Sequence, residues 1–139
     1  MPEIDTDELL DRFEASTVAV WNRGEIDEVD DLFADDVAVH EVPTGNTYEG
    51  LDEFKDWIRG IRTGFPDFVL DEDASTFFVA DDRIVSQWVF TGTHEGRLPG
   101  LDAEPTNQSV EVTGATIYAM DGQTVTEAWW YFDMMGLME

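Results

Sequence analysis

Hydrophobic residues recur at three- and four-residue steps through the first half of the chain, which is the spacing of an amphipathic helix. Leu9, Phe13 and Val20 lie on one such stripe, and Gly24 follows it with the conformational freedom common at a helix end. Pro66 ends the last stripe, because proline cannot continue the helical hydrogen bonding. The pattern predicts helices over residues 6–22, 25–33 and 51–63, with a turn at 35–36, a short strand over 37–42 and a loop over 43–46.

From Asp67 onward the hydrophobic period changes to two, which is typical of β-strands. The connections at Asp81-Asp82 and Asp121-Gly-Gln123 are short enough for antiparallel hairpins. Residues 95–105 contain glycine and proline and form a loop long enough to be a lid. The predicted strands cover residues 68–80, 83–94, 109–120 and 124–133. Helices followed by an antiparallel sheet indicate one α+β domain over residues 1–139.

The last predicted strand carries aromatic residues on both of its faces. Trp129 and Tyr131 share one parity with Asp133, whereas Trp130 and Phe132 share the other. Aromatic residues on both faces are typical of a strand that is covered on both sides. Asp133 is therefore either an acid held among aromatic side chains in a pocket or a polar residue that marks where the strand leaves the core.

The second parity of this strand predicts a homodimer. One sheet face is expected to lie under the helices of the same chain. Trp130 and Phe132, with Val85 and Val89 on a neighbouring strand, would then form an apolar patch on the outer face. A patch of that kind needs a partner, and a second copy of the chain is the expected one.

Composition narrows the class of protein. The chain has 139 residues, of which 42% are hydrophobic and 12% aromatic, so it can bury a core despite its net charge of −25. It has no cysteine, which excludes disulfides, a thiolate nucleophile and a cysteine-based metal site. The start has no basic leader, and no later run is apolar enough to span a bilayer. We expect a soluble cytoplasmic protein with no membrane contact.

The charge balance predicts the salt concentration to which the protein surface is adapted. Thirty-two acidic residues face seven basic ones, and Lys55 is the only lysine. Acidic residues spread along the whole chain favour a surface adapted to molar salt, where self-repulsion is screened and carboxylates hold water. An ordinary acidic protein is the alternative. With this charge, a nucleic acid or any other polyanion is not expected as a partner.

Six short segments occur in an order that resembles a known family. They are Val20-Trp-Asn-Arg-Gly24, Leu32-Phe-Ala-Asp-Asp36, Tyr48-Glu-Gly50, Phe65-Pro-Asp67, Thr91-Gly-Thr-His-Glu-Gly96 and Glu127-Ala-Trp129 with Asp133. Together they cover nearly the whole chain and resemble the SnoaL-like polyketide cyclases. The resemblance implies the cone-shaped fold of nuclear transport factor two and ketosteroid isomerase relatives, in which helices close over a strongly curved sheet and leave an internal pocket. Fold alone does not settle the reaction.

The resemblance also implies a role for Asp133. In the characterised cyclases an aspartate on the last strand is the general acid/base of an intramolecular aldol closure, without metal or cofactor, and Asp133 is the matching position. A carboxylate near Trp129 and Tyr131 would be partly desolvated, which would raise its pKa toward a useful range. The alternative is that Asp133 caps a final turn.

The two histidines and several aromatic residues complete the predicted site. The resemblance implies that His94 lies in the pocket, as a proton donor or as a group that orients the substrate. It matches His40 more loosely. The alternative for each is a satisfied imidazole at the end of a strand. Their spacing does not indicate a metal site. Ordinary core packing is the alternative for each predicted ligand-contacting aromatic residue. The residues predicted to contact the substrate are His40, Trp57, Trp88, Tyr118, Trp129 and Tyr131.

These predictions favour a cofactor-free enzyme that moves a proton next to the carbonyl of a small apolar or aromatic compound. Asp133 is the expected base, and His94 or Tyr118 polarises the oxygen. Aldol cyclisation is the reaction that the resemblance implies, and double-bond isomerisation uses the same groups. The competing hypothesis is a non-catalytic ligand-binding or dimeric interaction module of the same fold.

Overall fold

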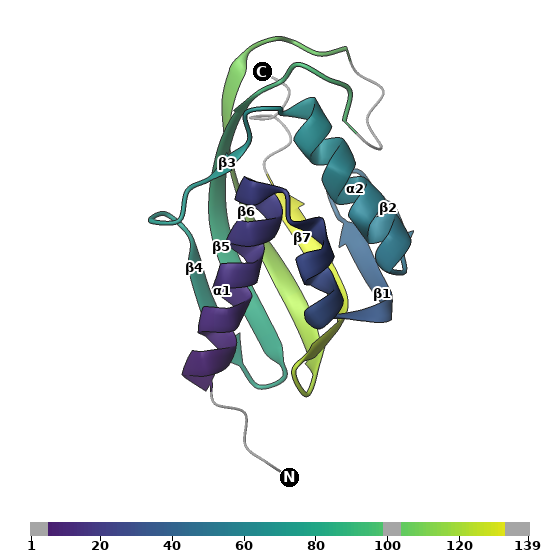
Figure 1. Ribbon diagram of the computed structural model, residues 1–139, viewed down its shortest axis with the longest axis vertical. Helices are drawn as coiled ribbons and strands as arrows, with labels where there is room; N and C mark the ends of the chain where they lie inside the picture. Colours follow the sequence, from purple (N-terminus) through teal and green to yellow (C-terminus); the bar gives the residue numbers. More distant parts are fainter. Residues whose placement is uncertain (1–5, 99–103, 133–139) are drawn as a thin grey trace.

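The computed structural model describes residues 6–98 and 104–132. Its helices all lie on one face of a seven-stranded sheet (Figure 1). They are α1 (Thr6–Arg23), the short 3₁₀ helix η1 (Ile26–Asp31) and α2 (Leu51–Gly64). The strands are β1 (Phe33–Glu41), β2 (Asn46–Glu49), β3 (Val69–Leu70), β4 (Thr76–Ala80), β5 (Arg83–Thr93), β6 (Ser109–Asp121) and β7 (Thr124–Phe132).

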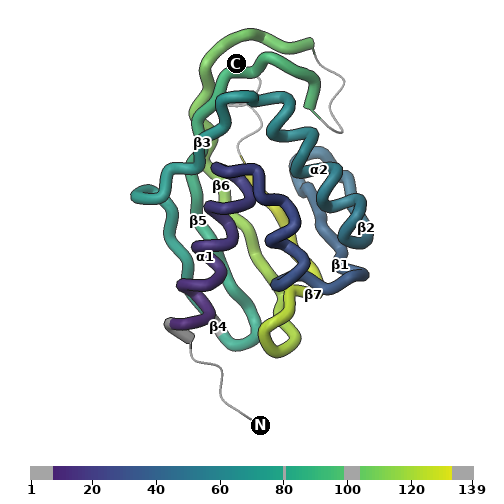
Figure 2. The backbone as a smooth tube through the Cα atoms, in the orientation of Figure 1, coloured from purple at the N-terminus to yellow at the C-terminus, as the bar shows by residue number. Residues whose placement is uncertain are grey.

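The sheet runs in the order β2-β1-β7-β6-β5-β3, and β4 pairs with the other half of β5. Among the described strands only β1 and β7 are parallel, so the first long strand lies beside the last, as the backbone in Figure 2 shows. Every other pairing is antiparallel. The sheet curls around the helices without closing. The predicted α+β fold, with helices over a curved and mostly antiparallel sheet, is confirmed.

The predicted helical stripes bury the core. Phe13 of α1 is 1% exposed, and its ring lies 4.7 Å from that of Tyr118 on β6. From α2, Phe54 and Ile58 are equally buried against the same face of the sheet. Burial of a side chain of this size stabilises a fold by about 1.5–3 kcal/mol. The spacing of apolar residues therefore predicted correctly which sides of both long helices face the sheet.

Several predicted boundaries are wrong for local reasons. The second helix covers residues 26–31 and not 25–33; it is a 3₁₀ helix, and Phe33 already belongs to β1. The turn expected at residues 35–36 lies inside β1, where the pairing with β7 shifts register between Phe33 and Ala38. The loop expected over 43–46 is shorter, because Asn46 already pairs with Glu41 as the first residue of β2.

The strand predicted over residues 68–80 is two strands, β3 and β4. Asp71 causes the break: its side chain accepts hydrogen bonds from the backbone of Asp73 and Ala74, at 3.1 and 3.2 Å. Its carbonyl oxygen also accepts a hydrogen bond from the hydroxyl of Ser75. An aspartate that binds the backbone two residues on stabilises a turn in preference to a strand. Among the described helices, none is long and apolar enough to cross a membrane.

Candidate active site

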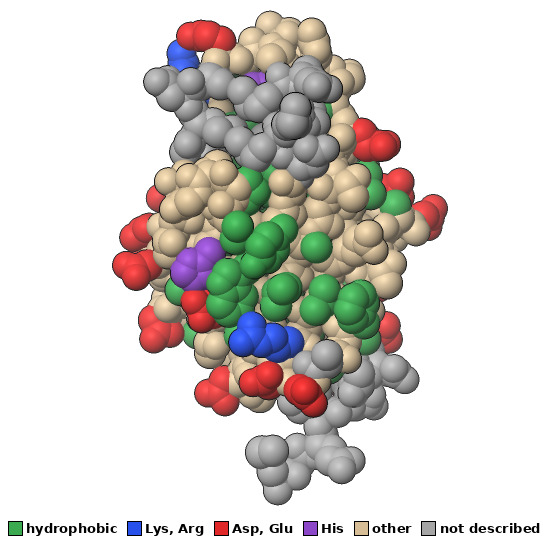
Figure 3. Space-filling view, turned by 180° about the vertical axis from the view of Figure 1, so that it is seen from behind, with side chains coloured by type: hydrophobic (Ala, Val, Ile, Leu, Met, Phe, Trp, Pro, Cys, Tyr) green, Lys and Arg blue, Asp and Glu red, His purple; other side chains and the backbone are tan. Residues whose placement is uncertain are grey.

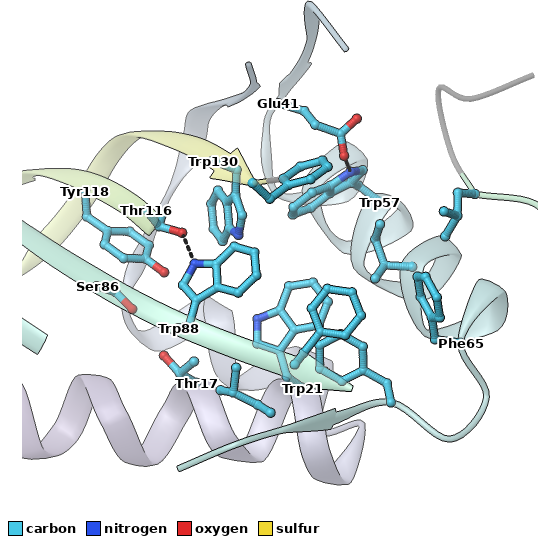
Figure 4. A pocket seen from close by; sticks show the side chains of 16 residues that line it. Thr17, Trp21, Glu41, Trp57, Phe65, Ser86, Trp88, Thr116, Tyr118 and Trp130 are labelled. Atoms are coloured by element: carbon cyan, nitrogen blue, oxygen red, sulfur yellow. Dashed lines mark hydrogen bonds between the residues drawn. The ribbon is translucent and has the colours of Figure 1, made fainter. Parts of the chain in front are cut away.

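A cavity lies between the helices and the inner face of the sheet (Figure 4). It encloses about 720 Å³ of space between atoms, part of it open to solvent. Its walls are mostly aromatic, and its polar side chains are Thr17, Glu41, Ser86 and Thr116, with the hydroxyl of Tyr118. The aromatic residues that line it are Trp21, Trp57, Phe65, Phe68, Trp88, Phe90, Tyr118, Trp130 and Phe132. Mostly apolar walls with a few polar groups are typical of a small-molecule site.

Glu41 is the one carboxyl group among the described residues that line this cavity, and it is only 2% exposed. Trp57 Nε1 donates a hydrogen bond to Glu41 Oε2 at 2.8 Å, and the Thr44 hydroxyl donates to Oε1 at 2.7 Å. Burial raises the pKa of Glu41 above its ordinary value, and the two hydrogen bonds offset part of that rise. A desolvated carboxyl that exchanges a proton nearer neutral pH is suited to acid/base chemistry.

The strand period explains why Glu41 points inward. Val37, Val39 and Glu41 are alternate residues of β1, and each is at most 2% exposed. The prediction concentrated on His40 and did not select Glu41, although Glu41 shares parity with the two buried valines. That parity was the signal that could have identified it.

The charge of Glu41 affects the pKa of a neighbouring tyrosine. The pKa of Tyr48 on β2 is raised to about 12, first by burial and then by the nearby Glu41 carboxylate. The ring of Tyr48 lies 5.7 Å from that of Trp57, the hydrogen-bond donor to Glu41. Tyr48 therefore stays neutral.

His94 lies at the end of β5 and is 1% exposed. Its backbone pairs with residues 107 and 108, which fixes its position. Its ring lies 5.5 Å from the ring of Phe65, which lines the cavity. Within the described part of the chain neither ring nitrogen of His94 has a hydrogen-bond partner. His94 is not among the residues that line the cavity, so its predicted role there stays a prediction.

Three of the residues predicted to contact substrate line the cavity, namely Trp57, Trp88 and Tyr118. The indole of Trp88 is held by a hydrogen bond from its Nε1 to the Thr116 hydroxyl, at 2.9 Å. Burial raises the pKa of Tyr118 far above its ordinary value, so its hydroxyl is neutral and can donate.

The other three, His40, Trp129 and Tyr131, lie on the outer face of the sheet. His40 Nε2 lies 2.6 Å from a carboxylate oxygen of Glu127, and its Nδ1 lies 3.1 Å from the Thr47 hydroxyl. The His40 ring stacks on Trp129, its partner across the strand pair, at 5.6 Å. These three side chains are outside the cavity.

The predicted assignment of faces on β7 is wrong. Trp130 is 6% exposed and lines the cavity with Phe132, whereas Trp129 and Tyr131 face outward and Tyr131 is 42% exposed. The pairing with β6 shifts register between Ala119 and Met120, opposite the start of β7. A register shift of this kind changes which residues of a strand face inward, and the sequence pattern alone does not show it.

Asp133, the predicted base, lies outside the described residues, which end at Phe132. The predicted lid over residues 95–105 is described only in part. In the ranges 6–98 and 104–132, no group of three or more histidine, aspartate or glutamate side chains lies close enough together to hold a metal ion. The absence of a metal or cofactor from the reaction remains a prediction from the sequence.

Comparison with solved structures shows the fold in other proteins. TsrD of Streptomyces laurentii superimposes with a TM-score of 0.80 at 18% identity, over 97% of this chain and 95% of TsrD. AclR of Streptomyces galilaeus, described as a candidate hydroxylase, superimposes with a TM-score of 0.75 at 22% identity, over 96% of this chain and 95% of AclR. A candidate polyketide cyclase of Acidithiobacillus ferrooxidans superimposes with a TM-score of 0.72 at 27% identity, over 99% of this chain and 95% of the cyclase.

No curated protein sequence matches the chain. A family profile does: that of the SnoaL-like polyketide cyclases matches residues 12–139, which is nearly the whole sequence. The match agrees with the order of segments in the sequence and with the helix-covered curved sheet. The chain therefore belongs to the SnoaL-like polyketide cyclase family.

Proposed function

We propose that the protein is a cofactor-free enzyme that transfers a proton next to the carbonyl group of a small apolar or aromatic compound. The observation that carries this proposal is the Glu41 carboxyl, buried in an aromatic cavity with a raised pKa. Family membership supports aldol-type cyclisation as the overall reaction. Double-bond isomerisation, which begins with the same proton transfer, is the related alternative.

The proposed chemistry needs a base and a donor. The ionised carboxyl removes a proton from the carbon beside the carbonyl, and the electron pair moves onto the oxygen as an enolate. A hydrogen-bond donor, His94 or Tyr118, stabilises that oxygen. In cyclisation the enolate carbon attacks a second carbonyl of the same molecule, and the new alkoxide takes up a proton. In isomerisation the carboxyl returns its proton at another carbon.

Two carboxyl groups are candidates for the base. Glu41 lines the cavity, and Asp133 is the position that matches the catalytic aspartate of characterised relatives. Asp133 shares its sequence parity with Trp129 and Tyr131, which face away from the cavity, and it lies outside the described residues, so its candidacy rests on the family match alone. We propose that one of them is the base, and substitution of each distinguishes them.

A non-catalytic ligand-binding module is the second candidate function. Both oxygens of Glu41 already accept hydrogen bonds, as they would in a group that only braces Trp57 and the turn around Thr44. Solved structures of the same fold include AclR, described as a candidate hydroxylase, so the fold is compatible with more than one activity. This candidate predicts binding without chemistry.

Hydrogen exchange separates the two candidates. We expect the protein to accelerate exchange of the hydrogens beside the carbonyl of 2-tetralone in D₂O, because proton removal is the first step of both proposed reactions. Proton NMR measures the rate, and heat-denatured protein at the same concentration is the control. Binding of 2-tetralone without accelerated exchange would favour the ligand-binding module.

We also propose that the protein is adapted to high salt. Its net charge of −25 produces self-repulsion that salt screens. The melting temperature, followed by circular dichroism, should rise strongly as potassium chloride increases from tenths molar to molar. A melting temperature that stays flat over this range would contradict the proposal.

A homodimer through the outer sheet face is the third part of the proposal. This face, seen in Figure 3, carries hydrophobic side chains at its centre and acidic ones mostly around its margin. The central residues include Val85, Val89 and Ile117, with Trp129 and Tyr131 in place of the predicted Trp130 and Phe132. A second copy would bury this patch.

Light scattering in molar potassium chloride should give about twice the chain mass of 15.7 kDa. Ile117→Glu places a charge in the centre of the patch and should give monomers, because an unpaired charge would then be buried. Gln108→Glu adds the same charge outside the patch, at an exposed position before β6, and should leave the mass unchanged. A parent protein that is monomeric at micromolar concentration would contradict this proposal.

A further inference from the structure

His40 lies at one end of a row of apolar side chains that crosses the outer face of the sheet. The row follows direct partners on five neighbouring strands, from β1 to β4. Its members are His40, Trp129, Ile117, Val85 and Phe78. In Figure 3 a histidine, in purple, borders the hydrophobic side chains of this face. A titratable group therefore lies directly beside the apolar patch.

Polar groups on both neighbouring strands hold the His40 ring. Its Nε2 lies 2.6 Å from a carboxylate oxygen of Glu127 on β7, and its Nδ1 lies 3.1 Å from the Thr47 hydroxyl on β2. Its flat side stacks on Trp129. The ring is thus fixed next to the Glu127 carboxylate, and we call His40 and Glu127 the outer ion pair.

Two further charged side chains lie near the outer ion pair. Glu49 on β2 is exposed and pairs with Ala38, two residues before His40. The guanidinium carbon of Arg83 on β5 lies 5.0 Å from the centre of the Trp129 ring. Arginine stays charged and exposed carboxylates stay ionised near neutral pH, whereas the charge of an imidazole ordinarily changes between about pH 5 and 8. Of these groups, His40 is the one that can respond to pH in that range.

The proposed dimer is large enough to cover the outer ion pair. Neighbouring strands lie about 4.8 Å apart, so His40 on β1 lies roughly 10 Å from Ile117 on β6, two strands away. A stable interface covers about 800 Å² of each partner, which is a disc of roughly 16 Å radius. A second copy centred on Ile117, in the middle of the row, therefore extends past His40 and Glu127.

We propose that two copies of the chain meet over the outer ion pair, so that association takes up a proton at each His40. This inference rests on the proposed dimer, and it specifies the polar groups in the interface and the pH at which the dimer is strongest. In the free chain water reaches the pair, whose side chains are 28% and 40% exposed. In the dimer the Glu127 carboxylate loses that water whatever the state of His40.

The state of His40 then decides the cost of burial. A protonated imidazole leaves a pair without net charge and with a charge-assisted hydrogen bond. A neutral imidazole leaves a buried carboxylate without a counter-charge, which is far less favourable. Each proton taken up also reduces the repulsion between two chains that each carry a net charge of −25. Low pH therefore favours the dimer.

Sedimentation equilibrium of the full chain at about pH 6 and about pH 8 tests the inference. Molar potassium chloride screens the long-range repulsion, so the local effect at His40 remains. The dissociation constant of the dimer should be about tenfold or more higher at the upper pH, because protons are released when the copies separate. Equal dissociation constants would overturn the inference while the dimer stands. A chain that is monomeric at both pH values would overturn both.

Three variants assign the proton. His40→Gln still forms hydrogen bonds but cannot ionise, so its dissociation constant should be the same at both pH values and close to that of the parent at the upper one. In Glu127→Gln a protonated His40 would be buried without a counter-charge, so the dissociation constant should not rise with pH. Glu111→Gln is the matched control, because it removes an exposed carboxylate from the start of β6 and should retain the rise.

Circular dichroism melting checks that each variant is folded. A rise with pH that survives in His40→Gln would assign the proton to another group and overturn the inference. A rise that is lost in Glu111→Gln would do the same, since it would trace the effect to the general charge of the face.

Discussion

Glu41→Gln should lower the rate of 2-tetralone exchange by about a hundredfold or more, which is the usual contribution of a general base. Glutamine keeps the size of the side chain and can still accept from Trp57 and donate to the Thr44 hydroxyl. It has no basic group, so the proton beside the carbonyl has no acceptor there. The comparison is between the parent and the variant at equal occupancy by the ketone.

The pH dependence gives this prediction a second measurement. As a base Glu41 acts when ionised, so the parent's exchange rate should rise with pH through a pKa above the ordinary glutamate value. A raised pKa means that the folded state favours the protonated carboxyl. Its contribution to stability is therefore present at low pH and is lost as pH rises through the raised pKa.

The Glu41→Gln variant should not lose stability as pH rises through this pKa, because glutamine does not ionise. Circular dichroism melting curves over the same pH range measure the stability of both proteins. A variant that exchanges 2-tetralone as fast as the parent would show that Glu41 only braces Trp57 and Thr44.

Asp133→Asn is expected to have an effect of similar size if Asp133 is the base. Asparagine keeps the shape and removes the basic group, so turnover should fall roughly a hundredfold or more while melting stays nearly unchanged. The parent's rate should then rise with pH through a pKa above the usual aspartate value of about 3.9. The same exchange assay measures both quantities.

The capping alternative for Asp133 gives a different result. Asparagine caps a helical turn about as well as aspartate does, so neither stability nor exchange would change much. An Asp133→Asn variant as active as the parent would remove Asp133 from the mechanism. If only one of the two substitutions abolishes exchange, that residue is the base. If both do, the two carboxyls act as one unit and their effects are not additive.

The helices were predictable from the sequence because their signal is local. The spacing along the chain alone places Leu9, Phe13 and Val20 on one side of a helix, and all three are buried. The hairpins at residues 81–82 and 121–123 were predictable for the same reason, since Asp81 and Gly122 adopt the left-handed conformation that short turns require.

The faces of β7 were not predictable in the same way. Aromatic residues occupy both parities there, so hydrophobicity does not distinguish the inner face from the outer one. The distinction depends on the register with β6 and on the parallel contact with β1, which is distant in the sequence. For Glu41 the sequence did contain the signal, because Glu41 shares parity with Val37 and Val39. It was not selected because a charged residue is rarely fully buried.

The hydrogen bond from Thr44 connects the turn between β1 and β2 to the buried carboxyl of Glu41. Thr44 belongs to the turn that joins β1 to β2, where Val42 is 41% exposed, yet its hydroxyl lowers the pKa of a carboxyl in the cavity. Changes in that turn could therefore retune the acidity of Glu41 without altering any wall of the cavity. Under the proposed function, substitutions in this turn would shift the pH at which the enzyme works.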